Sequence, residues 1–417
     1  MATFLSFTEG KHQTLQLGPN GLPNFINKAK TREININGIS KEEDLELERQ
    51  LKILNKHPVQ TFQKLKEGVT IDCIKINEQP SLDHPLLKNH KIQMQPNSFP
   101  KGVQVNNSAI EGILHSFKRA CPIGTIPIQR STKQDLIRAK SFWKLQIMSK
   151  FNNASTPNTF YPDHKIVKVR TTYIPNRYFG AKAGVSLSYS NLQLQNNQSS
   201  SSNLWIQSGN PTNIQIMSAG LMISKSLHGD INGAVHLFTF WTNDAYQTGC
   251  YNLLCQGFVQ VHPTISLGSP VISELTYGGE KIVEFIIYQD GPNGNWWLII
   301  GVKPIAKVTV GYWPSELFPF MRNGANHVGW GGSSWVGRNG LWAPMGNGAM
   351  PDGDYTHSAF FNNINFVDDY LAFKVPQDNQ TEDIVESPKC YGLVKTKKEE
   401  AQGGYILTFG GPGGYYC

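Results

Sequence analysis

The sequence has little charge and no long apolar run. Charged residues make up 17% of the 417 residues and hydrophobic residues 39%, so the chain can bury a core and is not a charge-driven disordered chain. Because no stretch approaches the roughly 18 apolar residues of a transmembrane helix, we expect no membrane partner. The first residues, MATFLSFTEGKHQTLQ, also lack the apolar stretch of a signal peptide.

Clustered positive charge is also missing. The net charge is +7, yet no Lys/Arg run is interleaved with aromatic residues, as a nucleic-acid footprint requires. We therefore expect no nucleic-acid partner. A moderately basic secreted protein explains the charge, and attraction to acidic cell-wall polymers is the alternative.

The common catalytic motifs are absent. The 11 histidines form no HExxH pair, and there is no P-loop, no GxGxxG after a strand and no GxSxG elbow. Gly332-Ser333-Ser334-Trp335 resembles a nucleophile elbow, but it lacks the glycine two places after the second serine. We expect no serine nucleophile there, no metal and no cofactor.

Six cysteines are present, which is an even number. Two of them lie close together in TGCYNLLCQGF, without a histidine or a second cysteine pair at zinc-ligand spacing, so a small disulfide loop fits better than a metal site. The remaining connectivity is not settled by the sequence. We expect the pairs Cys250–Cys255, Cys73–Cys121 and Cys390–Cys417.

Disulfides indicate an oxidising compartment. Four glycosylation sequons agree with this interpretation. We expect a secreted glycoprotein of the apoplast or vacuole, and we attribute the missing signal peptide to a wrong or missing first exon. The sequons begin at Asn106, Asn153, Asn197 and Asn379.

Beyond His164 the sequence consists of short strand-like runs. Aromatic and β-branched residues gather between Gly, Asn, Pro and Ser clusters, with no long helical pattern, which predicts an antiparallel β-sandwich of the jelly-roll or lectin-like kind. We expect loops over residues 196–203 (NNQSSSSN) and over the Gly-rich span 324–353. The runs include KIVKVRTTYI, VHLFTFWT, IVEFIIYQ, WWLIIGV and KVTVGYW.

The first part of the chain has a helical start signal. Ser40 and Glu43 match a capping box, and Leu47, Leu51 and Leu54 follow at helical spacing. The spacing predicts an amphipathic helix of about four turns that docks on another element. Further on, GVTIDCIKI alternates like a strand, and TKQDLIRAKSFWKLQIM, from about residue 132 to 148, predicts a second helix.

These patterns divide the chain into two folding units, as its length also suggests. We expect residues 1–39 to be unstructured, or to derive from an incorrect first exon. Residues 40–150 are expected to form a smaller mixed α/β pro-segment, and residues 151–163, rich in Asn, Pro and Ser, a linker. Residues 164–417 are expected to form the β-sandwich.

Several long blocks of the sequence resemble the neprosin family, plant proteins that include a glutamic prolyl endopeptidase. The resemblance runs from about residue 40 to the end, and it implies an activation segment over residues 40–150 followed by an antiparallel β-sandwich. The blocks in the first part are SKEEDLELERQL, DHPLLKNH, QMQP and CPIGTIPI. Those in the second part are YFGAKA, FWTNDAYQTGCYNLLCQGFVQ, GNWWL, VGYWPSELF, WGG and GGPG.

The resemblance implies an active site made of two glutamates on one sheet face, and this chain has neither. Ser218 occupies the first position, in Met-Ser-Ala-Gly-Leu, and Ser333 occupies the second, after Trp-Gly-Gly. A serine hydroxyl cannot take a proton from water near neutral pH, and loss of one acid–base group typically costs about 10²–10⁴ in rate. We therefore expect no catalysis through the family's pair.

Three functions remain open at this point. The first is a non-catalytic homologue that binds a proline-containing peptide or a cell-wall ligand in the former substrate cleft. The second is an active prolyl endopeptidase that uses other carboxylates, for which Asp230, Glu274, Glu280 and Glu284 are the candidates. The third is a carbohydrate-binding sandwich, which depends on the Trp content and on fold analogy.

The aromatic blocks supply the candidate groove. We name Trp330, Trp313 and Tyr312 as ligand-groove candidates, with packing in the core as the alternative for the Trp residues. Besides that ligand, the expected partner is the chain's own pro-segment, and we expect a monomer. Without the glutamates the chain should not cut off its own pro-segment.

Overall fold

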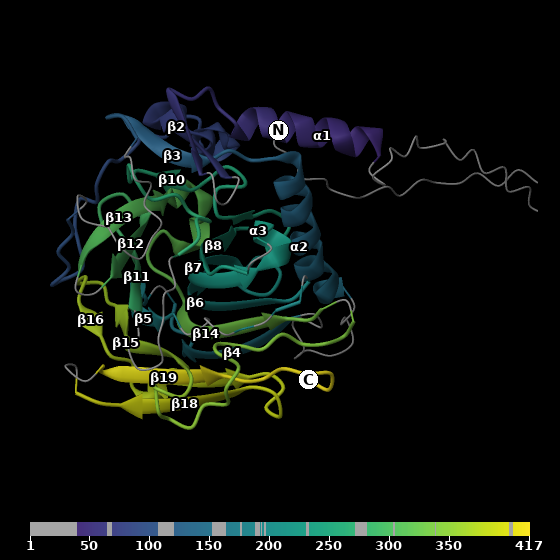
Figure 1. The fold of residues 1–417 in the computed structure, drawn as a ribbon. Helices are drawn as coiled ribbons and strands as arrows, with labels where there is room; N and C mark the ends of the chain where they lie inside the picture. The colour runs from purple at the N-terminus through teal and green to yellow at the C-terminus, as the bar shows by residue number, and fades with distance from the viewer. Residues whose placement is uncertain are drawn as a thin grey trace, which may run out of the picture.

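The computed structural model describes residues 40–417, except 65–68, 107–120, 152–163, 176, 188–191, 193, 196, 231–232, 272–281, 303–304, 338 and 400–402. Two large antiparallel sheets face each other, and an amino-terminal unit of helices and a small sheet lies against them (Figure 1). The expected fold class, an antiparallel β-sandwich preceded by a smaller mixed α/β segment, is confirmed. Residues 1–39 lie outside the described residues.

The amino-terminal unit begins with helix α1 (Lys41–Leu54), as predicted. The Ser40 hydroxyl accepts a hydrogen bond from the Glu43 amide at 3.1 Å, which caps the helix. The Glu43 carboxylate does not complete the capping box, because it pairs with Lys140 at 2.5 Å. Leu47 and Leu54 are buried against Leu136 of the second helix, so the amphipathic face docks as expected.

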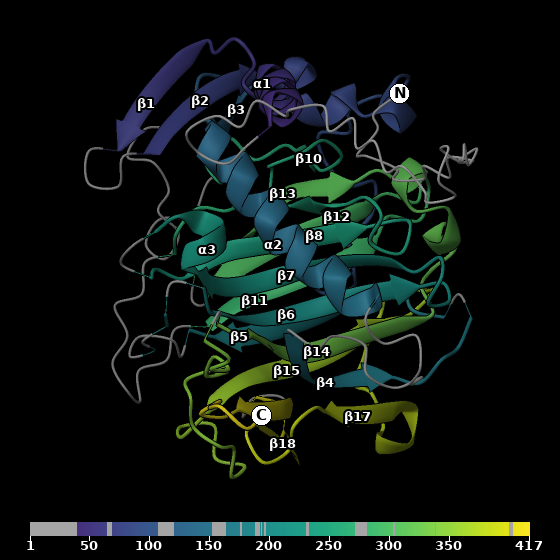
Figure 2. The ribbon, with the colours of Figure 1, turned by 90° about the vertical axis from the view of Figure 1, so that its right-hand side faces the viewer.

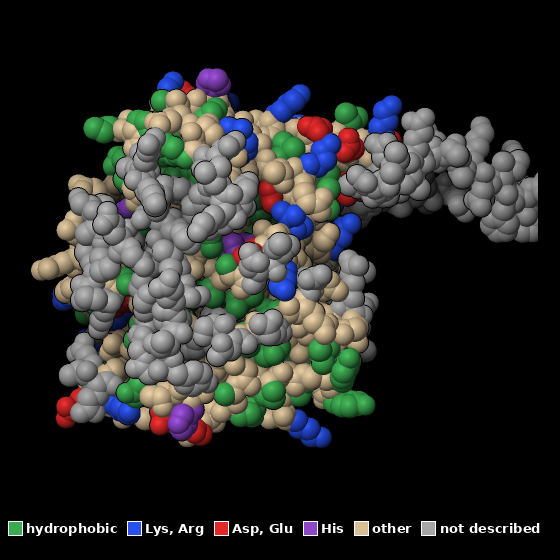
Figure 3. Space-filling view, in the orientation of Figure 1, with side chains coloured by type: hydrophobic (Ala, Val, Ile, Leu, Met, Phe, Trp, Pro, Cys, Tyr) green, Lys and Arg blue, Asp and Glu red, His purple; other side chains and the backbone are tan. Residues whose placement is uncertain are grey.

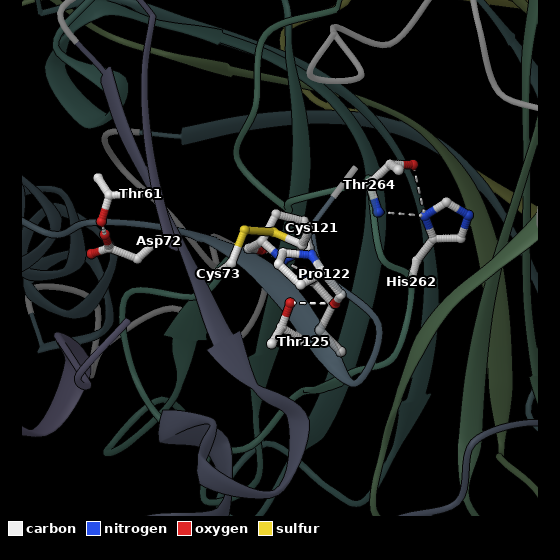
Figure 4. The surroundings of a disulfide bond; sticks show 10 residues. Thr61, Asp72, Cys73, Cys121, Pro122, Thr125, His262 and Thr264 are labelled. Carbon is white, nitrogen blue, oxygen red and sulfur yellow. Dashed lines mark hydrogen bonds between the residues drawn. A yellow bond between two sulfur atoms is a disulfide. The ribbon is translucent and has the colours of Figure 1, made fainter. Parts of the chain in front are cut away.

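A small three-stranded antiparallel sheet follows α1, with β2 in its centre. It is held by the disulfide Cys73–Cys121, which Figure 4 shows beside the hydrogen bond from the Thr125 hydroxyl to the Pro122 carbonyl. Its strands are β1 (Gln60–Lys64), β2 (Val69–Lys75) and β3 (Thr125–Gln129). The short helices η1 (Ile76–Glu78), η2 (Pro80–Asp83) and η3 (Pro85–Leu87) and the long helix α2 (Lys133–Phe151) complete the unit.

The first sheet of the sandwich has the strand order β17-β4-β14-β6-β7-β8-β9 and is antiparallel throughout. Helix α3 (Lys225–His228) follows β7. The strands are β4 (His164–Thr171), β6 (Ser199–Ser208), β7 (Gln215–Ser224), β8 (His236–Thr242), β9 (Cys250–Tyr251), β14 (His327–Trp335) and β17 (Thr381–Val385).

The second sheet has the order β10-β13-β12-β11-β5-β15-β19-β18, and β16 pairs with β15. Its strands are β5 (Gly180–Ser186), β10 (Val259–Gln260), β11 (Ile282–Gln289), β12 (Trp296–Val302), β13 (Ile305–Trp313), β15 (Ala359–Val367), β16 (Phe373–Lys374), β18 (Gly392–Lys397) and β19 (Tyr405–Gly410). The short helices η4 (Ser315–Leu317), η5 (Pro319–Met321) and η6 (Asp378–Gln380) lie in connections from this sheet to the first.

The main core fills the space between the two sheets. Alternate residues of each strand point into it, as the period of two in a strand requires. On β7, for example, Met217, Ala219 and Leu221 belong to this core, whereas Ile216 and Met222 pack on the outer face of the sheet. The outer faces of both sheets are therefore apolar as well, and both are covered.

Different parts of the amino-terminal unit cover the two outer faces. Helix α2 crosses the outer face of the first sheet, in front of β6, β7 and β8 (Figure 2). Residues 76–105, which we call the strap, pack on the outer face of the second sheet, against side chains that include Tyr288, Trp297 and Tyr312. The amino-terminal unit thus packs on both outer faces of the sandwich.

Two sequence-based loop predictions are wrong. Residues 199–203 of the span 196–203 belong to β6, and residues 327–335 of the Gly-rich span 324–353 form β14. Both are inner strands of the first sheet, and most of their residues are buried by neighbouring strands and side chains. Serine and glycine were predicted to form loops because they have weak strand propensity. In a sheet covered on both faces, small side chains let the neighbouring layers approach closely.

Within the described ranges, no helix combines the length and the apolar character that a membrane crossing requires. Over the same part of the chain, oppositely charged side chains alternate on the surface around α1 (Figure 3). Ion pairs there connect α1 with α2, including Lys133 with Asp44 at 2.9 Å and with Glu48 at 2.6 Å.

Candidate cleft on the first sheet

Ser218 and Ser333, the positions where the family resemblance predicts glutamates, lie on the same face of the same sheet. On β7, Ser218 alternates with the core residues Met217 and Ala219 and therefore points outward. On β14, Trp330 belongs to the core, so Ser333 points outward too. Both face the side that α2 covers, and their exposed fractions are 1% and 2%.

The two serines are not adjacent. Ser333 pairs with Ser201 of β6, whereas Ser218 pairs with Trp205, four residues further along that strand. Strand geometry places their Cα atoms roughly 16 Å apart. Asn203 of β6 lies midway between them, so glutamates at these positions would flank Asn203 from opposite sides.

Two glycines leave the sheet surface between the two serines without large side chains. Asn203 pairs with Gly331 of β14 on one side and with Gly220 of β7 on the other. A Cβ atom at either glycine would lie 2.0–2.1 Å from a backbone oxygen of the neighbouring strand, so no side chain fits there. The result is a row of small groups across three strands, with Asn203 as its central side chain.

Several polar atoms on this surface have no partner. Among the described residues, the Ser218 hydroxyl and Oδ1 of Asn203 are buried without a hydrogen bond. Nδ2 of Asn203 donates to the Ser201 hydroxyl at 2.8 Å. Buried polar groups are normally paired, so these two atoms are exceptions on this face.

Helix α2 covers this face of the sheet. Its Phe142 lies 5.3 Å, between ring centroids, from both Trp335 and Tyr251, and its Trp143 lies 5.9 Å from Phe240. These rings line the outer face of the first sheet. The sequence did not predict these rings as groove residues. Which face of the sheet they occupy could be assigned only after β6 and β14 were recognised as strands.

The groove candidates named from the sequence lie elsewhere. Trp330 and Trp313 have no exposed area and pack in the core between the sheets, so as groove residues they are wrong. Tyr312 lies on the outer face of the second sheet, where the strap covers it. Its hydroxyl lies 2.8 Å from Nε2 of His90 and accepts a hydrogen bond from the Gln93 amide at 3.0 Å.

The two described acids among those proposed as substitutes for the dyad are engaged away from the serines. Glu284 is on the second sheet and pairs with Lys307 at 2.9 Å. Asp230 follows α3 and accepts a hydrogen bond from the Ala234 amide at 2.7 Å. Glu274 and Glu280 lie outside the described residues.

Other carboxylates lie at one edge of this face. Glu382 belongs to β17 and pairs with Arg170 at 2.6 Å. Glu386 follows β17, and its Oε2 accepts a hydrogen bond from the Ile166 amide at 2.9 Å. Burial raises the pKa of the Glu386 carboxyl, while that hydrogen bond and the nearby Lys165 and Lys168 oppose the rise.

One lysine side chain of β4 lies on the same outer face. Lys168 pairs with Gly331, so it shares the outer face with Ser333 and Asn203. Its Nζ lies 5.5 Å from the centre of the Trp205 ring, a cation–π contact. Burial lowers the pKa of Lys168 to about 8, with repulsion from Arg170 adding to the effect and Glu386 and Glu382 opposing it. Sequence reasoning missed this residue.

All three expected disulfides form: Cys73–Cys121, Cys250–Cys255 and Cys390–Cys417. Of the candidate glycosylation sites, Asn106 and Asn379 are exposed and Asn197 is half-buried. Asn153 lies outside the described residues. Over the described part of the chain, no three His, Cys, Asp or Glu side chains gather as a metal site would require.

A surface pocket lies apart from the cleft and includes neither serine. It is lined by residues that include Tyr173, Asn213, Phe320 and Arg322. None of the candidate residues named from the sequence lines it, so it has no part in the site.

Comparison with known families agrees with the geometry. The family model described as Neprosin matches residues 196–412, slightly more than half of the chain. The chain belongs to the neprosin family. The model described as Neprosin activation peptide matches residues 63–168, which include the strap, β3 and α2. The elements that cover the two outer faces of this neprosin-family protein are therefore its activation peptide.

One solved structure with a low similarity to the chain is the crystal structure of Scytalido-glutamic peptidase with a peptide based transition state analog. The identity is 9% and the TM-score 0.31, over 59% of this chain and 97% of that one. The fold described above is established by the strand pairing of this chain itself.

Proposed function

We propose that this protein is a non-catalytic member of the neprosin family, a secreted monomer that binds a proline-containing peptide or a cell-wall ligand in the cleft between Ser218 and Ser333. The observation that supports it is that both dyad positions share one buried face and both are serine. The described carboxylates at the edge of that face are already engaged, Glu382 by Arg170 and Glu386 by the Ile166 amide. Peptide cleavage by a glutamic peptidase needs one carboxylate to activate water and a second to protonate the leaving group.

The cleft keeps the features of a binding site. Aromatic rings such as Phe240 and Trp335 lie on this face. Gly220 and Gly331 separate the serines, and Oδ1 of Asn203 and the Ser218 hydroxyl have no hydrogen-bond partner. The three disulfides and the exposed sequons at Asn106 and Asn379 support secretion. The pro-segment, packed on both outer faces, is proposed to stay attached unless another protease cuts the linker near residues 150–163, because the chain lacks the carboxylates to remove it.

The experiment is cleavage of a fluorogenic proline-containing peptide at about pH 3 to 6, where a carboxyl pair can share a proton. The wild-type protein should be inert, and the double variant Ser218→Glu/Ser333→Glu should gain activity. Ser218→Gln/Ser333→Gln is the matched control, because it adds the same bulk without acids. The proposal would be overturned if the repurified wild-type protein cleaved the peptide and the glutamine control cleaved it as well.

A second candidate is a peptidase that uses Glu386. The observation in its favour is that burial raises the pKa of this carboxyl at the edge of the same face, as a general acid requires. If the wild type cleaves the peptide and Glu386→Gln abolishes cleavage, this candidate replaces the first.

A further inference from the structure

The surface pocket that includes neither serine lies at one end of the first sheet. It has a volume of about 750 Å³, within the range of about 300–1,000 Å³ that is usual for small-ligand sites. Its walls come from the chain after β4, the turn between β6 and β7, and the segment that contains η5 and leads into β14. Every described residue that lines it belongs to the sandwich, so the described part of the pro-segment does not cover it.

Two exposed aromatic side chains line this pocket. The exposed fraction of Tyr173 is 60% and that of Phe320 is 47%. The Tyr173 ring packs against the His327 ring, with 5.5 Å between the ring centroids, and the Phe320 amide donates to Oε1 of the buried Gln215 at 2.9 Å. Both rings are therefore anchored, and their negative π faces can attract the polarised C–H groups of a ligand.

The turn between β6 and β7 presents hydrogen-bond donors. Oδ1 of Asn213 accepts a hydrogen bond from the Asn210 amide at 2.8 Å. Oδ1 of Asn210 accepts from the Thr212 amide at 3.0 Å and from the Thr212 hydroxyl at 2.7 Å. The two side-chain oxygens are thus used inside the turn, while neither Nδ2 group donates to a described residue.

The charge of the pocket is positive. Arg322 lines it and is exposed, and its carbonyl accepts a hydrogen bond from Nε2 of the buried Gln289 at 2.9 Å, which holds the backbone there. No acidic residue is among the described lining residues, and within the described part of the chain the Arg322 guanidinium has no carboxylate partner. A planar guanidinium binds a carboxylate through two parallel hydrogen bonds.

We propose that this pocket binds an acidic oligosaccharide, a chain of uronate sugars. A sugar carboxylate pairs with Arg322, the Nδ2 groups of Asn210 and Asn213 donate to sugar oxygens, and the rings of Tyr173 and Phe320 pack on the C–H faces of the sugars. The net charge of +7 favours the approach of such a polyanion. The site lies outside the cleft, so this inference does not depend on the proposed function.

The hydrogen-bond groups favour a sugar over an acidic peptide. A peptide brings backbone N–H groups that need acceptors, and the side-chain oxygens of Asn210 and Asn213 are already occupied. A sugar hydroxyl can rotate to accept a hydrogen bond wherever the protein supplies a donor. The pocket supplies donors, a cation and stacking surfaces, which match the hydroxyls, carboxylates and C–H faces of uronates.

The test is isothermal titration calorimetry of the full-length protein with trigalacturonate at low salt. The fully methyl-esterified trisaccharide has the same sugars without the charge, and a Glu-rich peptide is the peptide arm. Arg322→Met removes the cation. Arg177→Met is the matched control, because Arg177 is also exposed but is not among the residues that line the pocket.

Trigalacturonate should bind about tenfold more tightly than its methyl ester, because the hydrogen bonds to Arg322 are charge-assisted. Arg322→Met should abolish that preference and Arg177→Met should keep it. Tyr173→Ala removes an exposed ring without disturbing the core, and it should weaken the binding of the acid and of the ester by the same factor. This variant tests the site even if Arg322→Met does not fold.

The other outcomes would overturn the inference. Equal binding of the acid and its ester, equal loss in the two arginine variants, or unchanged binding by Tyr173→Ala would show that the sugar is not held in this pocket. Arg322-dependent binding of the Glu-rich peptide without binding of trigalacturonate would replace the sugar by an acidic peptide. No binding of either ligand would refute the site and leave the proposed function of the cleft untouched, since none of these variants alters that face.

Discussion

Asp290, directly after β11 of the second sheet, accepts two hydrogen bonds from Asn97 of the strap. The Asn97 amide N–H donates to Oδ2 of Asp290 at 2.9 Å, and the side-chain Nδ2 donates to the same oxygen at 3.0 Å. Gln93 and Ser98 donate two more, both at 2.8 Å. Asp290 has no exposed area, so one buried carboxylate of the sandwich is satisfied by three residues of the activation peptide.

Replacing this carboxylate should loosen the strap. Asp290→Asn removes the charge and turns one acceptor into a donor that faces other donors, so we expect the free energy of unfolding to fall by about 2–4 kcal/mol. Urea unfolding followed by tryptophan fluorescence measures the change. Asp369→Asn, at an exposed carboxylate, is the control, and equal stability of the two variants would show that the strap does not depend on Asp290.

The pro-segment should remain bound even after the chain is cut. The disulfide Cys73–Cys121 closes within the pro-segment, so no disulfide joins it to the sandwich, but the strap and α2 pack on both outer faces. With a protease site inserted in residues 152–163 and then cut, both fragments should co-elute in gel filtration and separate in denaturing gels. Elution of the sandwich alone would contradict this expectation.

The uncut state is a separate prediction. Because both dyad positions are serine, protein expressed without host proteases should keep residues 40–150 attached. Intact-mass measurement and amino-terminal sequencing check this. A mature amino terminus near His164 in such a preparation would contradict the absence of self-cleavage.

Lys168→Met should stabilise the folded protein near neutral pH. Burial lowers the pKa of Lys168 in the folded chain to about 8 from the ordinary value of 10.5. The unfolded chain therefore binds the proton more tightly, and folding is penalised in full below pH 8. As the pH rises from 8 to 10.5 the wild type should recover stability, and the advantage of the variant should shrink.

Thermal unfolding at a series of pH values measures that difference. Lys165→Met, on the same strand, is the control. An advantage of Lys168→Met that does not change between neutral and alkaline pH would show that packing, and not charge, is responsible.

The disulfide Cys73–Cys121 should stabilise the pro-segment strongly. It closes a loop with a sequence separation of 48, for which chain entropy predicts about 4 kcal/mol. Cys73→Ser/Cys121→Ser should therefore lower the urea midpoint of pro-segment unfolding. Cys250→Ser/Cys255→Ser removes a disulfide with a sequence separation of 5, so it should lower a urea unfolding midpoint by less. A larger fall in this variant than in Cys73→Ser/Cys121→Ser would contradict the loop-length argument.

Much of the fold could be predicted from local pattern. Ser40 followed by Leu47, Leu51 and Leu54 identified α1 and its cap, and the β-branched and aromatic runs identified β8, β11, β12 and β13. The prediction failed at β6 and β14, where serine and glycine form the centre of a sheet. Their strand state depends on burial between neighbouring strands and not on propensity.

By itself, the sequence indicated the family by resemblance and the antiparallel β-sandwich by its strand-like runs, and it placed Cys250 and Cys255 close enough for a disulfide, because these depend on residue identity and local spacing. Only the tertiary structure decided which faces meet. It buried Trp330 and Trp313 between the sheets, placed Tyr312 under the strap, and brought Lys168 across Gly331 to Trp205. Those outcomes depend on strand order and register, which bring together residues far apart in the chain.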